Sequence, residues 1–381
     1  MAATTAPAPG RFMLSRRAER LRRTGALLTH TALFAVTSLS AVAVVFIFVF
    51  IIKDAVPFFR LRGAREFFTS TQWYPSGEPP SFGALPLFVG SGLVTLGAVV
   101  VAVPLGVCAA ACLSDILPFQ LRQLVKPIIE VLAAIPSVAF GFFALVVVAP
   151  MLQEQGGRLL AVAAWAVGVP VSALAVLFLA GYAGALLPPE RRVLGRVSLG
   201  VSLGALALLF LRWATRRLDA LEVSSGTNAL NVSVILGIMA LPTVVSVSED
   251  ALQAVGRGLR EGSYALGATR AETVLRVVVP AAASGIGAAA ILGVMRAAGE
   301  TMVVWMASGN AAQVPHPWYN LLQPVRTLTA TIAGDMGEAE HSVDAPRYTV
   351  LFALALCLVT LSFLLNLASE WAMRRTRRKL E

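Results

Sequence analysis

Eight long stretches of this chain are almost free of acidic and basic residues, and this pattern constrains the fold most. A helix needs about 20 apolar residues to cross a hydrocarbon layer about 30 Å thick. In lipid, an open chain satisfies its backbone hydrogen bonds only as a helix. The sequence therefore predicts an all-α, polytopic transmembrane helix bundle. The predicted spans lie in 24–52, 79–114, 131–153, 159–189, 197–211, 223–248, 277–308 and 348–369.

The overall composition excludes an ordinary water-soluble protein. Hydrophobic residues make up 57% of the chain and charged residues only 14%, whereas a soluble domain carries about a quarter charged residues. The net charge of +10 would suit a nucleic-acid partner. However, the basic residues are split among short segments between the apolar stretches and form no continuous stripe.

Lys and Arg residues are unevenly distributed among the connecting segments. About two thirds of the 31 basic residues fall in 1–23, 115–130, 190–196, 249–276 and 370–381. All five segments lie on one side if the chain crosses the membrane eight times. Because basic residues accumulate on the cytoplasmic side, we expect these segments and both termini in the cytoplasm. The fifth span is the weak point, since the 15 residues of 197–211 reach only about 22 Å.

The spans and loops predict five regions along the chain. Spans four and five must cross together or not at all, because otherwise every later loop changes sides; they look like an insertion. The last two spans are separated by an external loop, 310–346. The regions are a basic cytoplasmic N-terminus (1–23), spans one to three with an external loop at 53–85 (24–150), the two-span insertion (151–222), spans six to eight (223–370) and a basic cytoplasmic tail (371–381).

The longest cytoplasmic segment, 249–280, is predicted to be structured. Its apolar residues recur at helical spacing on both sides of Gly267, which predicts two short amphipathic helices. Pro280 then stands at the start of a span, where a helix tolerates proline. The pattern leaves two interpretations open: the segment docks onto another protein, or it lies on the lipid surface.

This segment resembles the cytoplasmic signature of permease subunits of binding-protein-dependent ABC importers. The signature reads Glu-Ala-Ala, three residues, Gly, nine residues, Ile-x-Leu-Pro. Here Glu261-Gly262-Ser263, Gly267 and Val277-Val278-Val279-Pro280 keep that spacing. The resemblance implies the permease core of a type I importer, with six spans plus the insertion. It also implies that this segment is the coupling helix that docks onto an ATPase subunit.

Four further stretches resemble phosphate permeases of the PstC type in particular. They are 73–92, 126–142, 292–310 and 324–340, whereas 151–222 departs from the shorter members. The resemblance implies transport of inorganic phosphate across a bacterial inner membrane. The implied partners are a homologous PstA-type permease, an ATPase dimer and an external phosphate-binding protein.

The chain carries no sign of its own catalytic chemistry. A phosphate-binding P-loop requires Gly-Lys-Ser/Thr, but Lys53, Lys126 and Lys379 are followed by Asp, Pro and Leu. We therefore expect no cofactor in this chain, and ATP bound and hydrolysed by a separate subunit. The three His and three Cys residues show no metal-ligand spacing.

Arg296 and Glu300 are the charged residues inside a predicted span. Their spacing of four predicts that they share one helical face. Charged residues in a membrane normally face a bundle interior or a watery cavity. In one interpretation, Arg296 offers its guanidinium to a phosphate in transit and Glu300 holds the arginine. In the other, the two form a closed ion pair that packs the helices.

Two other charged residues are weaker candidates. Glu130, before the predicted third span, would line an inner gate in one interpretation. We favour the other, in which its carboxylate solvates a helix start. In the external loop 310–346 we expect solvated residues, with Arg326 as the one to test.

Three alternative functions were weighed. A permease for another oxyanion, such as sulfate or molybdate, fits the cytoplasmic signature equally well. A secondary transporter would show inverted repeats and more intramembrane carboxylates. An intramembrane protease would need a zinc motif or a Ser with a His partner in the membrane, and only His30 is available.

Overall fold

The chain, described by a computed structural model over residues 16–185, 188, 192–338 and 346–380, is almost entirely helical. This confirms the predicted all-α membrane bundle. The first half contains α1 (Arg16–Arg62), α2 (Ala64–Thr69), α3 (Leu85–Ala111), π-helix η1 (Cys112–Ile116), α4 (Phe119–Ala134), α5 (Ser137–Phe143), π-helix η2 (Ala144–Val148) and α6 (Ala149–Ala185). The second half contains α7 (Arg192–Asp219), α8 (Ala229–Ala254), α9 (Arg257–Ala265), α10 (Arg270–Thr273), π-helix η4 (Val274–Val278), α11 (Val279–Ala281), α12 (Ala283–Ala298), α13 (Met302–Ala307), α14 (Leu328–Met336) and α15 (Pro346–Leu380).

A short antiparallel pair of strands interrupts the helices between α2 and α3. β1 (Trp73–Tyr74) pairs with β2 (Ser81–Phe82), with Trp73 opposite Phe82. Both of these aromatic side chains are buried in a cluster with Phe58 and Phe67. The predicted external loop 53–85 is therefore partly helix and partly hairpin, and packed aromatic rings hold it against the bundle.

The centre of the bundle is the close contact between α3 and α8, against which α12 also packs. Glycines make this contact possible. A Cβ at Gly106 would lie 2.7 Å from Cγ1 of Val244, and one at Gly237 would lie 2.8 Å from Cβ of Val101. Such distances are too short for any larger residue. The helices therefore pack backbone to backbone, as is common in membranes.

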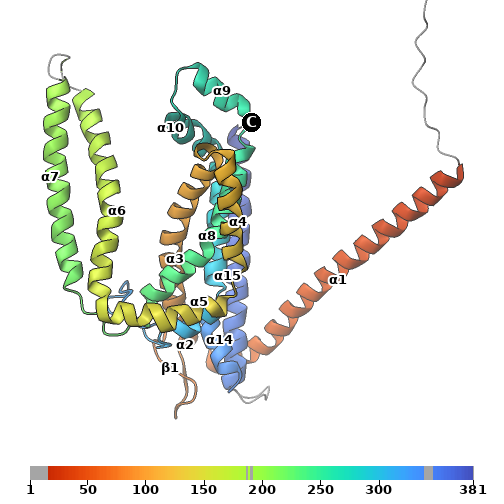
Figure 1. Cartoon of the computed structure of the whole chain (residues 1–381). Coiled ribbons are helices and arrows are strands. Elements are labelled where there is room, and N and C mark those ends of the chain that lie inside the picture. Colours follow the sequence, from red (N-terminus) through yellow and green to blue (C-terminus); the bar gives the residue numbers. More distant parts are fainter. Residues whose placement is uncertain (1–15, 186–187, 189–191, 339–345, 381) are drawn as a thin grey trace, which may run out of the picture.

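The structure changes the bounds of the predicted spans. Six helices in the described ranges are long and apolar enough to cross a membrane, and one bent pair raises the number to seven. The prediction of eight treated 131–153 and 159–189 as separate spans. Residues 137–153 and 159–182 instead belong to one helical stretch, which has a kink at Gln155. In Figure 1 this stretch crosses the lower end of the bundle before α6 turns upright.

The predicted third span is wrong because a proline breaks it. α4 ends at Ala134, and Ile135 is extended with ψ of 126°. Ile135 precedes Pro136, and steric clash with the proline ring favours this extended conformation in the preceding residue. The upright helix beside α3 and α8 is instead α4 (Figure 1), whose 16 residues cover about 24 Å.

The fifth span is longer than predicted. α7 covers 28 residues, or about 42 Å, because Arg212, Arg216 and Arg217 continue the helix instead of ending it. α6 and α7 pack on each other, and this α6–α7 hairpin stands apart from the remaining helices (Figure 1). That it is an insertion stays a prediction. The predicted end of the fourth span, Pro189, lies outside the described residues.

The segments predicted to share a membrane side lie at one end of the molecule. Figure 1 shows α9, α10, the end of α15 and the adjoining ends of α6 and α7 together at the top. β1 and α14 lie at the bottom. Which end faces the cytoplasm stays a prediction, and most of the N-terminal segment 1–23 lies outside the described residues.

Candidate functional site

The predicted coupling segment contains a short helix on the surface. α9 covers Arg257–Ala265 and follows α8 after a two-residue link. Leu259 and Tyr264 keep 55% and 43% of their surface exposed, and Glu261 and Gly262 are exposed as well. Exposed apolar residues beside charged ones suit both interpretations, contact with another protein and contact with the lipid surface. We call α9 the docking helix, after the first of these.

The docking helix ends at a glycine with left-handed backbone. Gly267 has φ of +82°, a conformation that other residues rarely adopt because of their Cβ. Its N–H donates to the carbonyl of Tyr264 (2.9 Å), and the N–H of Ala268 donates to the carbonyl of Ser263 (3.2 Å). These two bonds form a Schellman motif. The left-handed backbone at the end of the docking helix therefore explains why the signature has glycine at this position.

A second short helix completes the segment. Thr269 and Glu272 form a capping box that starts α10. The hydroxyl of Ser263 shares a 2.9 Å hydrogen bond with that of Thr273, which ties the docking helix to α10. The two predicted helices separated by Gly267 are thus confirmed. Pro280 lies in α11, immediately before the bend of 72° between α10–α11 and α12.

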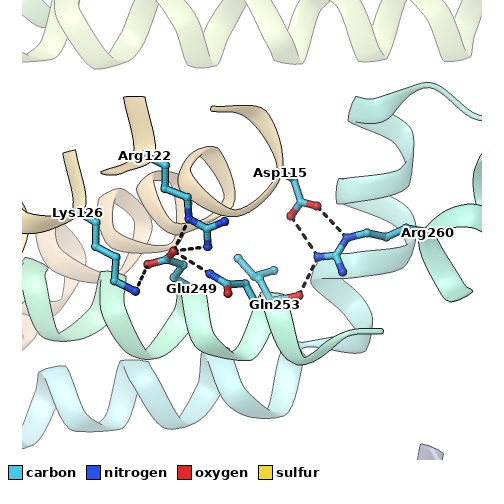
Figure 2. Close-up of polar contacts among 7 residues, drawn as sticks. Asp115, Arg122, Lys126, Glu249, Gln253 and Arg260 are labelled. Carbon is cyan, nitrogen blue, oxygen red and sulfur yellow. Dashed lines mark hydrogen bonds and ion pairs between the residues drawn. The ribbon is translucent and has the colours of Figure 1, made fainter. Parts of the chain in front are cut away.

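Behind the docking helix, Arg260 points inward and joins three segments. Its Nε donates to Oδ1 of Asp115 (2.9 Å) in η1. Nη2 donates to the carbonyl of Leu252 (2.8 Å), and Nη1 to the carbonyl of Val255. The side chains of Arg260 and Asp115 are only 17% and 8% exposed. Figure 2 shows this contact.

A second charged cluster lies beside it, centred on Glu249 of α8 (Figure 2). Glu249 is 1% exposed and accepts hydrogen bonds from Arg122 (2.5 Å) and Gln253 (2.8 Å). Nζ of Lys126 lies 3.2 Å from its other oxygen. The buried carboxylate is thus paired and hydrogen-bonded, as a buried charge must be, and it joins α8 to α4.

Neither cluster is predicted from the sequence. The charges of 115–130 favour a connecting segment, although Arg122 and Lys126 have the spacing of one helical face. That spacing was the available signal for a shared acidic partner. For Asp115 and Arg260 no signal in the sequence indicated a contact, because 145 residues separate them.

Arg296 lies in the last turn of α12 and is partly buried against α8. Its Nη1 donates to Oγ1 of Thr243 on α8 (3.2 Å). Its Nε is buried and has no hydrogen-bond partner within the described residues. A guanidinium with five donors therefore has unused hydrogen-bonding capacity there.

The predicted pairing of Arg296 with Glu300 is wrong. α12 ends at Ala298, so Glu300 does not continue the helical face. The carboxylate of Glu300 instead accepts from the N–H of Met302 (3.2 Å), next to the start of α13. Among the described residues, no ion pair joins Arg296 to Glu300.

The weaker candidates differ in their surroundings. Glu130 is exposed and makes no ion pair within the described part of the chain. It lies near the C-terminal end of α4, so the prediction that it solvates a helix start is wrong. Arg326 is no solvated loop residue: its Nη2 lies 2.6 Å from Oδ1 of Asp335, with both side chains mostly buried. They line a pocket of about 400 Å³ that also includes Trp73 and Arg347.

No group of three or more His, Cys, Asp or Glu residues able to hold a metal occurs in the ranges that the structure describes. The three cysteines are free thiols.

Comparison with known proteins links this architecture to transport. The profile of the family described as binding-protein-dependent transport system inner membrane component matches residues 102–378. The "Probable ABC transporter permease protein YqgH" of Bacillus subtilis is 28% identical over 82% of this chain and 78% of its own length. The phosphate transport system permease protein PstC of Mesorhizobium japonicum is 31% identical over 81% and 78%.

A further relative covers nearly the whole chain. Phosphate transport system permease protein PstC 2 of Mycobacterium tuberculosis is 29% identical over 352 residues, or 92% of each chain. The family profile itself covers more than half of the residues and includes the docking helix and both charged clusters. The chain therefore belongs to the family of binding-protein-dependent transport system inner membrane components, and it is a multi-pass membrane transport component, not an enzyme.

Proposed function

We propose that this chain is the permease subunit of an ABC importer for inorganic phosphate. The observation that carries the proposal is the similarity to proteins named phosphate permeases along up to 92% of both chains. In this assembly, a homologous PstA-type permease forms the other half of the pathway. An external binding protein delivers phosphate, and an ATPase dimer binds and hydrolyses ATP, so this chain needs no cofactor.

The orientation follows from the role of the docking helix. An ATPase acts in the cytoplasm, so the end that holds α9 and α10 faces the cytoplasm of a bacterial inner membrane. Both chain termini then lie on that side, in agreement with the distribution of basic residues. Glu261, Gly262, Ser263 and Gly267 shape the ATPase contact.

Arg296 is the residue proposed to contact phosphate in the membrane. A guanidinium matches two phosphate oxygens at once. Among the described residues, Arg296 forms no ion pair with Glu300, and its side-chain hydrogen-bond partner, Thr243, is neutral. A charged group inside the membrane is energetically costly, and such residues usually mark a functional site. Glu300, whose carboxylate accepts from the N–H of Met302, stays a prediction as a pathway residue.

Substitution of Arg296 tests the route. Phosphate uptake by cells carrying Arg296→Gln should fall about 10- to 100-fold, the equivalent of a charged hydrogen bond of about 1.5–3 kcal/mol. Arg296→Lys keeps the charge without the fork and should give intermediate uptake. Arg212→Gln on exposed α7 is the matched control, and membrane insertion is measured for each variant. Uptake at the control level in Arg296→Gln would remove Arg296 from the route.

Another oxyanion is the competing substrate. The signature around Gly267 and the guanidinium of Arg296 suit sulfate or molybdate equally well, and only the similarity to named phosphate permeases favours phosphate. Uptake of labelled phosphate should be inhibited by excess unlabelled phosphate and unaffected by equal concentrations of sulfate or molybdate. Inhibition by either of these would assign the chain to that oxyanion.

A further inference from the structure

Arg260 occupies the joint between the docking helix and the bundle. The docking helix is separated from α8 by two residues, and Arg260 reaches back across this link to the carbonyls of Leu252 and Val255. Its remaining donors contact Asp115, which follows α3. One side chain thus holds α9, the end of α8 and the end of α3 in fixed relative positions (Figure 2).

Stability alone is a weak explanation for this contact. A mostly buried ion pair usually contributes no more than apolar residues of similar size would, because both charges lose their hydration. What such a pair supplies is defined geometry, through several directional hydrogen bonds. The cation also lies at the C-terminal end of α8, where the helix dipole favours it. The contact is therefore suited to fixing a position.

The elements joined by Arg260 form one block at this end of the bundle. Glu249 links α8 to α4 through Arg122 and Lys126. Beneath these charges, the apolar side chains of Leu113 and Leu252 pack in one cluster with residues of η4 and α11. A force applied to the docking helix is thus passed to α3, α4 and α8 together.

The same block leads to the proposed phosphate contact. Arg296 is hydrogen-bonded to Thr243, which lies on α8 nine residues before Leu252, or about 13.5 Å along the helix. Movement of α8 therefore shifts the partner of Arg296 directly. A rigid, physically connected element of this kind can carry coupling between two sites.

We propose that Arg260 is a positioning residue for transport: through Asp115 and the end of α8, it converts displacement of the ATPase-bound docking helix into movement of α3 and α8. This inference rests on the proposed function and adds to it the residues that transmit force. Loss of the contact should leave the ATPase bound and able to hydrolyse ATP. A smaller fraction of the hydrolysed ATP should then drive phosphate transport.

The test uses the complete transporter reconstituted in liposomes with its binding protein, with ATP hydrolysis and phosphate uptake measured in the same vesicles. In Arg260→Gln and Asp115→Asn, the ratio of phosphate transported to ATP hydrolysed should fall at least about fivefold. The double variant should fall no further than Arg260→Gln alone, because both changes remove one contact. Arg260→Lys should restore part of the ratio.

Arg347→Gln is the matched control, since it breaks an ion pair with exposed Glu338 at the opposite end of the molecule. Its ratio should equal that of the wild type. An unchanged ratio in Arg260→Gln, or uptake and hydrolysis that fall together with the amount of bound ATPase, would overturn the inference. Wild-type vesicles that take up no phosphate contradict the proposed function instead. In that case the rate of ATP hydrolysis is measured with and without the binding protein. The inference holds if the binding protein stimulates hydrolysis in the wild type but not in Arg260→Gln, and it is wrong if both are stimulated equally.

Discussion

Gly267 shows how a single backbone conformation shapes the docking segment. With φ of +82° it turns the chain out of α9, and the capping box of Thr269 and Glu272 starts the next helix two residues later. The nine residues that separate Gly267 from Val277 in the signature therefore hold a cap, a short helix and a π-helix. A residue with a Cβ at this position would oppose the turn.

Substitution at this glycine should weaken ATPase binding. Gly267→Ala places a Cβ in the left-handed region, which costs about 1–2 kcal/mol, although open space surrounds the position. Affinity of the purified permease for the ATPase should fall by a factor of about 5 to 30. Gly204→Ala is the control, because Gly204 lies inside α7, away from the docking helix and with open space around it, where alanine is favoured over glycine by about 0.5–1 kcal/mol. Equal affinities for the two variants would contradict the role of the turn.

The residue scale also shows what spacing cannot predict. A separation of four residues places Arg296 and Glu300 on one face only if the helix continues, and α12 ends between them. Conversely, the spacing around Gly267 was informative because it reflects a local turn that the sequence itself determines. Contacts such as Arg260 with Asp115 depend on tertiary packing and have no local signal.

At the scale of elements, the predicted helix boundaries are wrong where charged residues are paired in the folded chain, because the sequence does not reveal the partners. α4 carries Arg122, Lys126 and exposed Glu130 and was predicted as a loop, yet Glu249 pairs with the first two. Once paired, such residues are tolerated in a helix that packs on the bundle. The existence of α1, α3, α8 and α15 was predictable, because each is long and apolar.

The α6–α7 hairpin should be dispensable for ATPase binding. Within the contacts of α7, α6 is its main partner, and a Cβ at Gly157 would lie 2.5 Å from the carbonyl of Asp219. The two ends of the hairpin are therefore adjacent. Removal of 158–219 with a short linker should preserve membrane insertion, and capture of the ATPase should match the full chain. Because two crossings are removed together, later loops keep their side.

The control for this deletion is removal of α8, an equally apolar element. Because a single crossing is lost, the docking helix changes sides, and the packed surface of α3 is exposed; capture should therefore be abolished. A hairpin-deleted chain that inserts normally but captures no ATPase would show that 151–222 is part of the core and not an insertion.

On the scale of the whole molecule, the elements predicted to share a side lie at one end although they are distant in the sequence (Figure 1). The distribution of Lys and Arg predicted this arrangement even though it gave the wrong boundaries for individual spans. Loop charge depends on the side of the membrane and not on the exact ends of the helices. Topology is thus more predictable from the sequence than packing is.

The orientation itself can be measured with cysteines at the two ends. In a variant without Cys108, Cys112 and Cys357, a cysteine is introduced at Ala265 of the docking helix or at Ser76 beyond β1; both positions are exposed. A membrane-impermeant maleimide should label Ser76→Cys in intact cells and Ala265→Cys only after the membrane is opened. The two variants control each other for reactivity. Labelling of Ala265→Cys from outside would place the docking helix in the external compartment, where ATP is not supplied, and both proposals for it would then be wrong.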